Sequence, residues 1–233
     1  MKNWYQLTES ETLDKLGVTS EGLSSQQADS LLEKHGKNVL EESKKKSVFQ
    51  VFLSQFADLM VIILIIAAIV SMFSGSVEST IVIFAVITLN AILGTVQHVK
   101  AEKSLESLKS LSSPSAKVIR DGRKIEIDSE NIVPGDIVVL EAGDLVVADG
   151  RIINNYSLQV NESSLTGEST NIDKSVETIE KEVPLADRTD MVFSGSLVTY
   201  GRAIVVVTET GMNTEIGKIA TLMNQAKSKK TPL

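Results

Sequence analysis

Residues 59–96 read LMVIILIIAAIVSMFSGSVESTIVIFAVITLNAILGTV, and this segment sets the architecture of the chain. It contains two runs without any charged residue, 59–73 and 81–96. As a helix, the first run would span about 22 Å, which is short of the roughly 30 Å hydrocarbon core of a bilayer. Extending this helix toward the N-terminus supplies the missing length. The sequence therefore predicts a transmembrane hairpin of two helices, 48–73 and 77–96, joined by a tight turn.

Basic residues on both flanks of the hairpin indicate its orientation. A lysine triplet at 44–46 precedes the hairpin, and Lys100 and Lys103 follow it. Because cytoplasmic flanks are enriched in Lys and Arg, both ends are expected in the cytoplasm, as in a multi-pass protein of the cell membrane. A buried helical hairpin of a soluble protein is the weaker alternative, since neither run has the polar stripe of a surface helix.

The second helix is predicted to continue beyond the membrane. Apolar residues at helical spacing, Ala101 and Leu105 among them, extend the pattern to Leu111. A helix over 77–111 would be about 52 Å long, so about 20 Å would project into the cytosol. This projection would form a rigid stalk for the domain that follows.

Asp58 is the one charged residue inside the predicted first helix. A carboxylate within a membrane is a functional candidate by default. Asp58 lies toward the cytoplasmic end of the helix, however, where a charge costs little, and we favour a structural role.

Residues 1–46 are predicted to form a small helical arm that packs on the later domain. Thr8 and Ser24 each begin a capping-box pattern at a helix start, and Gly17 and Gly36 provide the matching helix ends. The first residues lack an apolar signal segment, so a cleaved targeting peptide is not expected.

Residues 112–226 change to a period of two, which is typical of strands. The clearest signal is a hairpin over 116–127, turned by the dipeptide Asp121-Gly122. Further short strands are predicted at 137–140, 145–147, 152–153, 157–160, 191–193 and 202–207. Gly, Pro and Asp turns between them indicate a compact β sandwich, roll or barrel-like domain, closed by a helix over 214–225. The basic segment 227–230 fits a return to the membrane surface and a solvated tail equally well.

Composition excludes several classes of function. The 233 residues suffice for one or two domains, and the net charge of −7 without a basic face argues against a nucleic-acid partner. No Cys and only two His are present, so neither thiolate chemistry nor a histidine metal site is expected. The sequence has no P-loop and no dinucleotide fingerprint, so no cofactor site is expected within this chain.

Residues 163–169, SSLTGES, form a short polar segment within the β-rich region. Its single carboxylate, Glu168, stands between Gly167 and Ser169. Small hydroxyl residues around a glycine most often only make a turn. From these residues alone, Glu168 is either a turn residue or a chemical group.

The ordered set of motifs resembles the P-type cation-transporting ATPases. The motifs are Pro134-Gly135-Asp136, Ala148-Asp149-Gly150-Arg151, Leu165-Thr166-Gly167-Glu168-Ser169, Phe193-Ser194-Gly195 and Thr214-Glu215-Ile216-Gly217-Lys218-Ile219. Their order and spacing are similar to those of the family's actuator domain. The segment 55–59, QFADL, and the N-terminal arm resemble the type II branch, and bacterial calcium pumps in particular.

The resemblance implies an α+β membrane protein with a two-helix transmembrane hairpin and a cytoplasmic, β-rich actuator domain. The family's actuator is a distorted jelly roll of the double-stranded β-helix type. On this basis we divide the chain into an arm (1–46), a hairpin with its stalk (47–111), an actuator (112–226) and a linker (227–233) toward a third transmembrane helix.

The resemblance also implies a role for the loop. In this family the actuator loop acts on an aspartyl-phosphate that a different domain carries. Glu168 would orient and partly deprotonate the attacking water, Thr166 and Gly167 would shape the loop, and Ser169 would support the carboxylate. The full pump would use ATP and Mg²⁺ on domains outside this chain, and Ca²⁺ would be the exported cation.

Two departures from the family pattern matter. Asn161 stands where the family commonly has Asp, which alters charge or hydrogen bonding near the loop. The chain ends at Leu233, near the expected start of the third membrane helix. The phosphorylation and nucleotide-binding domains and the remaining transmembrane helices would be its partners, and this portion alone is not expected to hydrolyse ATP.

Two rival functions remain open. A non-catalytic, membrane-anchored adaptor with a partner-binding β domain would explain the hairpin and the strands, but not the ordered motifs. A self-contained hydrolase is weaker still, because the sequence shows no Ser-His-Asp set, metal cluster or phosphate loop.

Overall fold

The computed structural model describes residues 3–40, 47–111, 114–167 and 170–228. The chain divides into two compact units. One unit joins the N-terminal arm to residues 113–233, and the other comprises residues 42–112. The lysines at 44–46 lie outside the described residues.

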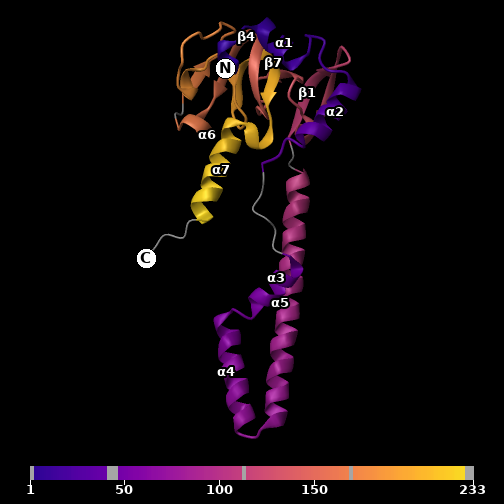
Figure 1. The fold of residues 1–233 in the computed structure, drawn as a ribbon, viewed down its shortest axis with the longest axis vertical. Coiled ribbons are helices and arrows are strands. Elements are labelled where there is room, and N and C mark those ends of the chain that lie inside the picture. Colours follow the sequence, from indigo (N-terminus) through magenta and orange to yellow (C-terminus); the bar gives the residue numbers. More distant parts are fainter. Residues whose placement is uncertain (1–2, 41–46, 112–113, 168–169, 229–233) are drawn as a thin grey trace. The chain divides into compact units, whose positions relative to one another are not determined.

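The described residues of the apolar unit, 47–111, form three helices: α3 (Val48–Gln55), α4 (Leu59–Phe73) and α5 (Val77–Leu111) (Figure 1). The bounds of α5 confirm the predicted helix over 77–111. The prediction of one continuous helix over 48–73 is wrong, because α3 and α4 meet at a bend of 62°.

Asp58 explains the bend. Its backbone is extended, with φ −70° and ψ 137°, and its carboxylate accepts a hydrogen bond from the Met60 N–H at 2.9 Å. Asp58 is therefore the N-cap of α4, and it starts a new helix instead of lying inside a long one. The structural role favoured for Asp58 is confirmed, although in the form of a cap.

The composition of α5 suits a membrane span. The helix contains an 18-residue window with a mean hydropathy of 2.1, and by length and composition its residues 77–105 could cross a bilayer. The bent pair α3–α4 is a second candidate only if both helices count as one span. Large apolar side chains on these helices are exposed, such as Phe73 at 86% and Leu89 at 69%, while the contacts between helices bury small residues such as Ala68 and Ala91.

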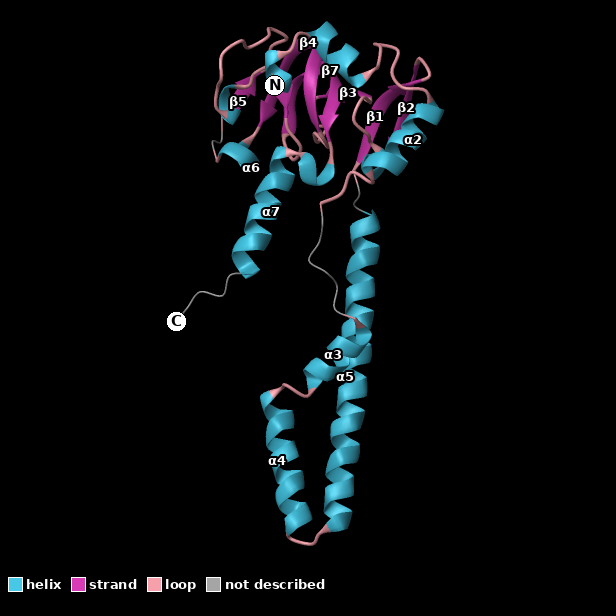
Figure 2. Cartoon of the chain, viewed as in Figure 1, coloured by secondary structure: helices cyan, strands magenta, loops and turns pink. Residues whose placement is uncertain are grey.

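The other unit contains an antiparallel sheet of seven strands (Figure 2). The strands are β1 (Ser115–Arg120), β2 (Arg123–Asp128), β3 (Ile137–Glu141), β4 (Asp149–Asn161), β5 (Asn171–Asp173), β6 (Met191–Val192) and β7 (Leu197–Glu209). Their order is β2-β1-β3-β7-β4-β5, and β6 pairs with β4 off this path. This sheet confirms the predicted class, in which helices accompany an antiparallel β domain.

Some of the predicted strands are confirmed and others are not. The β1–β2 hairpin turns at Asp121 and Gly122, whose φ values of 51° and 69° are those of a primed turn, as predicted. The short strands expected at 152–153 and 157–160 are instead parts of the single strand β4, which pairs with β7 through several bulges. Residues 145–147 form only an isolated bridge, from Leu145 to Leu197.

The core lies on both faces of the sheet, because neighbouring residues in a strand point to opposite sides. On β7, Val205 belongs to one cluster and Val206 to the other. The second cluster includes apolar residues of α1 (Glu9–Leu16) and α2 (Ser25–His35), so the arm covers one face of the sheet. Both helices begin with the predicted capping boxes and end at glycines.

Short elements complete the unit. They are η1 (Trp4–Gln6), η2 (Ser129–Asn131), α6 (Ser163–Thr166), η3 (Leu185–Asp187), η4 (Gly211–Asn213) and α7 (Glu215–Ser228). The α7 helix begins one residue after its predicted start, and its first turn is capped by the Thr214 hydroxyl, which accepts from Gly217 N–H at 3.1 Å.

Candidate functional site

The loop singled out in the sequence connects β4 to β5 and begins with the single turn α6. The Thr166 hydroxyl donates to the Glu162 carbonyl oxygen at 3.1 Å, which holds Thr166 against the start of the turn. Gly167 ends α6 in the left-handed conformation, with φ 77°. Glu168 and Ser169, the other two predicted site residues, lie outside the described residues.

The Phe193-Ser194-Gly195 motif contacts α6 and holds it in place. The Ser164 hydroxyl donates to the carbonyl oxygen of Gly195 at 3.1 Å. Gly195 itself has φ 86°, and an added Cβ there would lie 3.2 Å from the Ile216 side chain. The loop, the Phe193-Ser194-Gly195 motif and the start of α7 therefore meet at one place.

Asp149 connects these parts. Its two carboxylate oxygens accept hydrogen bonds from the backbone N–H groups of Ser194 and Glu215, each at 2.8 Å. Burial raises the pKa of Asp149 to about 6, although the two backbone donors favour the charged form. One side chain thus holds together three motifs that are separated by dozens of residues in sequence.

Other motif residues form buried ion pairs within the scaffold. Arg151 lies 3.1 Å from Asp190, and both side chains are fully buried. Arg120 donates to both carboxylate oxygens of Asp136, at 2.8 and 2.6 Å. Burial raises the pKa of Asp190 to about 6 and lowers the pKa of Arg151. These residues lie within the sheet domain, and Asp190 also interacts electrostatically with Lys174.

Sequence reasoning missed the pair Glu162–Lys174. Its atoms Oε1 and Nζ are 2.5 Å apart, and both side chains are fully buried. Burial raises the pKa of Glu162 and lowers that of Lys174. In the sequence both residues read as surface charges, because charged side chains are seldom buried. The proximity of Glu162 to the loop was the only available signal.

Asn161, where the family commonly has Asp, has a local role. Its side-chain oxygen accepts from the Ser163 N–H at 3.1 Å, just before α6. An amide oxygen and a carboxylate oxygen can both accept this bond, so the turn does not require Asp here.

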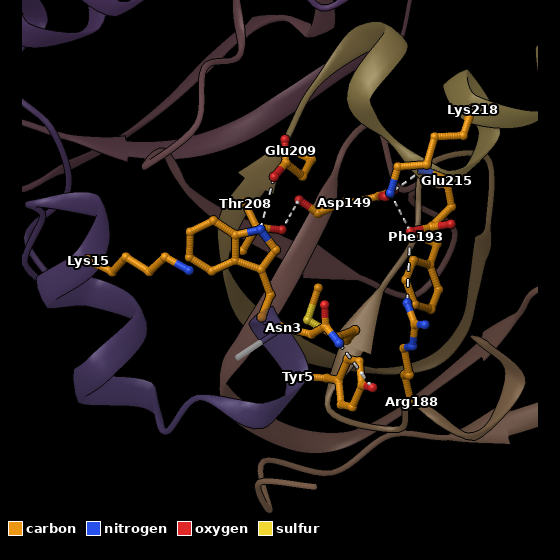
Figure 3. A pocket seen from close by; sticks show the side chains of 12 residues that line it. Asn3, Tyr5, Lys15, Asp149, Arg188, Phe193, Thr208, Glu209, Glu215 and Lys218 are labelled. Atoms are coloured by element: carbon orange, nitrogen blue, oxygen red, sulfur yellow. Dashed lines mark hydrogen bonds and ion pairs between the residues drawn. The ribbon is translucent and has the colours of Figure 1, made fainter. Parts of the chain in front are cut away.

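A cavity of about 300 Å³ lies where the N-terminal arm meets the sheet and the start of α7 (Figure 3). The Trp4 indole N–H donates to the Glu209 carboxylate at 2.9 Å, and the Lys15 ammonium lies 4.0 Å from the centroid of the Trp4 ring. On the other side, the Arg188 guanidinium lies 4.6 Å from the centroid of the Tyr5 ring. These contacts join the arm to the domain.

Within the described residues, no three His, Cys, Asp or Glu side chains are placed to bind a metal. The described part of the site is a surface turn that ends at the left-handed Gly167 and is bonded to Glu162 and Gly195.

Comparisons with known proteins match both units. The family profile of the P-type ATPase actuator domain matches residues 110–224, and that of the cation transporter/ATPase N-terminus matches residues 4–71.

Curated relatives match nearly the whole chain. A calcium-transporting ATPase of Listeria monocytogenes is 48% identical over 229 residues, 98% of this chain and 26% of the relative. Calcium-transporting ATPase 1 of Bacillus cereus is 44% identical over 240 residues, all of this chain and 27% of the relative. A cation-transporting ATPase of Synechocystis is 40% identical over 218 residues, 94% of this chain and 24% of the relative. The chain spans about a quarter of the length of these relatives.

Proposed function

The chain belongs to the P-type ATPase family, with that family's N-terminal and actuator regions, and from this premise we propose that it serves an ATP-driven Ca²⁺ export pump. Support for the ion comes from relatives at 42–48% identity that are named calcium-transporting ATPases. A calcium site needs six to eight oxygen ligands, which the apolar helices α4 and α5 do not supply. Ion selectivity would therefore reside in other membrane helices of the same pump.

The actuator's task in this pump is the hydrolysis of an aspartyl-phosphate on another domain. Glu168 accepts a proton from the attacking water, the new bond forms between water oxygen and phosphorus, and the aspartate carboxylate leaves. Gly167 and Thr166 keep the loop narrow, and Ser169 supports the carboxylate. ATP and Mg²⁺ act on the domains that form and hold the phosphorylated aspartate.

One observation carries this assignment. The turn 163–167 begins the β4–β5 connection with Gly167 in the left-handed conformation, and Ser164 bonds it to the Phe193-Ser194-Gly195 motif that Asp149 also holds. Because glycine has no side chain, it leaves space for the carboxylate of the next residue to approach a phosphate closely.

The membrane part completes the proposal. We assign α5 and the bent pair α3–α4 to two spans of a multi-pass protein whose flanking lysines place both ends in the cytoplasm. The 35 residues of α5 form an unbroken helix. Such a helix can transmit movement of the actuator to the ion pathway.

Replacing Glu168 by Gln in the complete pump tests the assignment. A general base contributes about 10²- to 10⁴-fold, so decay of the phosphoenzyme should slow by that factor while its formation from ATP is retained. Glu33→Gln, at an exposed carboxylate of α2, is the matched control and should leave decay unchanged. Normal decay in Glu168→Gln would sink the catalytic role of the loop.

A further inference from the structure

Glu162 and Lys174 bracket the catalytic loop. Glu162 directly follows β4, and Lys174 directly follows β5. The two strands pair up to the position Asn161–Asn171, and α6 and Gly167 follow this last pair in the chain. The ion pair between Glu162 and Lys174 thus lies at the base of the loop, and both side chains are fully buried there.

The backbone of Glu162 carries the turn. Its carbonyl oxygen accepts from the N–H groups of Leu165 at 2.9 Å and Thr166 at 3.0 Å, and also from the Thr166 hydroxyl at 3.1 Å. A displacement of Glu162 would therefore move the turn that ends at Gly167. Lys174 is also fixed to β4, because its backbone N–H donates to the Leu158 carbonyl oxygen at 3.0 Å.

The surroundings of the pair restrict the positions that its two side chains can occupy. The Lys174 ammonium lies 5.5 Å from the centroid of the Phe193 ring, in the motif that also supports Ser164. Each charge is removed from water and has the other as its closest compensation, so neither can shift without a large penalty. In some proteins a buried pair of this kind specifies one arrangement where an apolar contact would allow several.

We propose that Glu162 and Lys174 are positioning residues for dephosphorylation: through the ion pair and the Glu162 carbonyl they hold α6, and with it Gly167 and Glu168, at the correct distance from the phosphate. The proposal rests on the proposed function of the loop. Misplacement of a catalytic group by about 1 Å can cost about 10²-fold in rate. A pair that touches no substrate can thus control the rate of the chemical step.

The test measures both the amount of phosphoenzyme and its decay rate constant in the complete pump. Phosphoenzyme is formed from labelled ATP, and its amplitude and first-order decay are measured in Glu162→Gln, Lys174→Met and the double variant Glu162→Leu/Lys174→Leu. A purely structural pair would lower only the amplitude, because fewer molecules fold. A positioning pair lowers the decay constant, by about 10- to 100-fold, for each molecule that folds.

The double variant keeps the test informative where single variants fail to fold. It removes both charges together, and such replacements often preserve stability. Slow decay with a near-normal amplitude is expected. Lys174→Arg, which keeps the charge, should restore part of the decay constant relative to Lys174→Met.

Asp136→Asn is the matched control. It removes the negative charge from the ion pair between Arg120 on β1 and Asp136 in the turn before β3. In the sheet, β1 is three strands from β4 and β3 is two strands from it. It should lower the amplitude and leave the decay constant unchanged. A normal decay constant in the double variant, or equal slowing in Asp136→Asn, would overturn the proposal. If Glu168→Gln itself decays normally, the proposed function fails instead; if only Glu168→Gln is slow, this inference alone fails.

Discussion

Replacing Gly167 by Ala in the complete pump should slow phosphoenzyme decay without unfolding the actuator. Gly167 has φ 77° and ψ −2°, a conformation that costs an L-residue about 1–2 kcal/mol. An added Cβ would meet no atom within 4 Å, so the penalty lies in the backbone and not in packing.

The size of the effect follows from this penalty. If the loop must keep the left-handed conformation to act, about 1–2 kcal/mol corresponds to a decay constant lowered about 5- to 30-fold. The same penalty is small beside a typical unfolding free energy of about 5–15 kcal/mol, so the amplitude of phosphoenzyme should persist. Decay is measured after labelled ATP is chased with unlabelled ATP.

A matched glycine separates loop geometry from general strain. Gly143, in the turn after β3, has φ 95° and also has open space around the position of a Cβ. Gly143→Ala carries a similar backbone penalty away from the loop and should decay normally. Asn visits the left-handed region more readily than Ala, so Gly167→Asn should recover part of the rate. Normal decay in Gly167→Ala, or equal slowing in Gly143→Ala, would refute this reasoning.

Three further predictions concern the scaffold and the membrane helix. Because the pKa of Asp149 is higher in the folded state than its ordinary value of 3.8, the folded chain binds more protons, and this carboxyl lowers stability as pH rises from about 4 to about 6. The unfolding free energy of Asp149→Asn, relative to the parent chain, should therefore rise by about 2 kcal/mol between pH 4 and pH 7; a constant difference would contradict the assigned burial. Gly150→Ala should destabilise the domain by at least about 1–3 kcal/mol in chemical denaturation. The reason is that the added Cβ would lie 2.3 Å from a Val205 methyl and 2.8 Å from the Val206 carbonyl oxygen. An unchanged denaturation midpoint would show that β4 and β7 can separate there. Inserting several glycines after Val99 should uncouple Ca²⁺ transport from ATP hydrolysis by breaking α5, and intact coupling in vesicles would exclude the rigid helix as the link.

Local signals in the sequence were sufficient for the elements that local chemistry controls. The caps at Thr8 and Ser24, the Asp121-Gly122 turn and the bounds of α5 depend on residues close together in the chain. The ordered motifs also led to the family before any contact was known. These features are predictable because backbone hydrogen bonds, turn preferences and the apolar length of a span act over short sequence distances.

Tertiary contacts decided the rest. The break at Asp58 is the exception, because it is local: the sequence was compatible with one helix over 48–73, and the bond from Asp58 to the Met60 N–H divided it into α3 and α4. Pairing with the long strand β7 merged two expected strands into β4. Glu162 and Lys174, which read as surface charges, lie buried against each other beneath the loop. Whether a charge is solvated or paired in the interior depends on residues that folding brings together. The motif SSLTGES therefore does not indicate the buried pair that supports it.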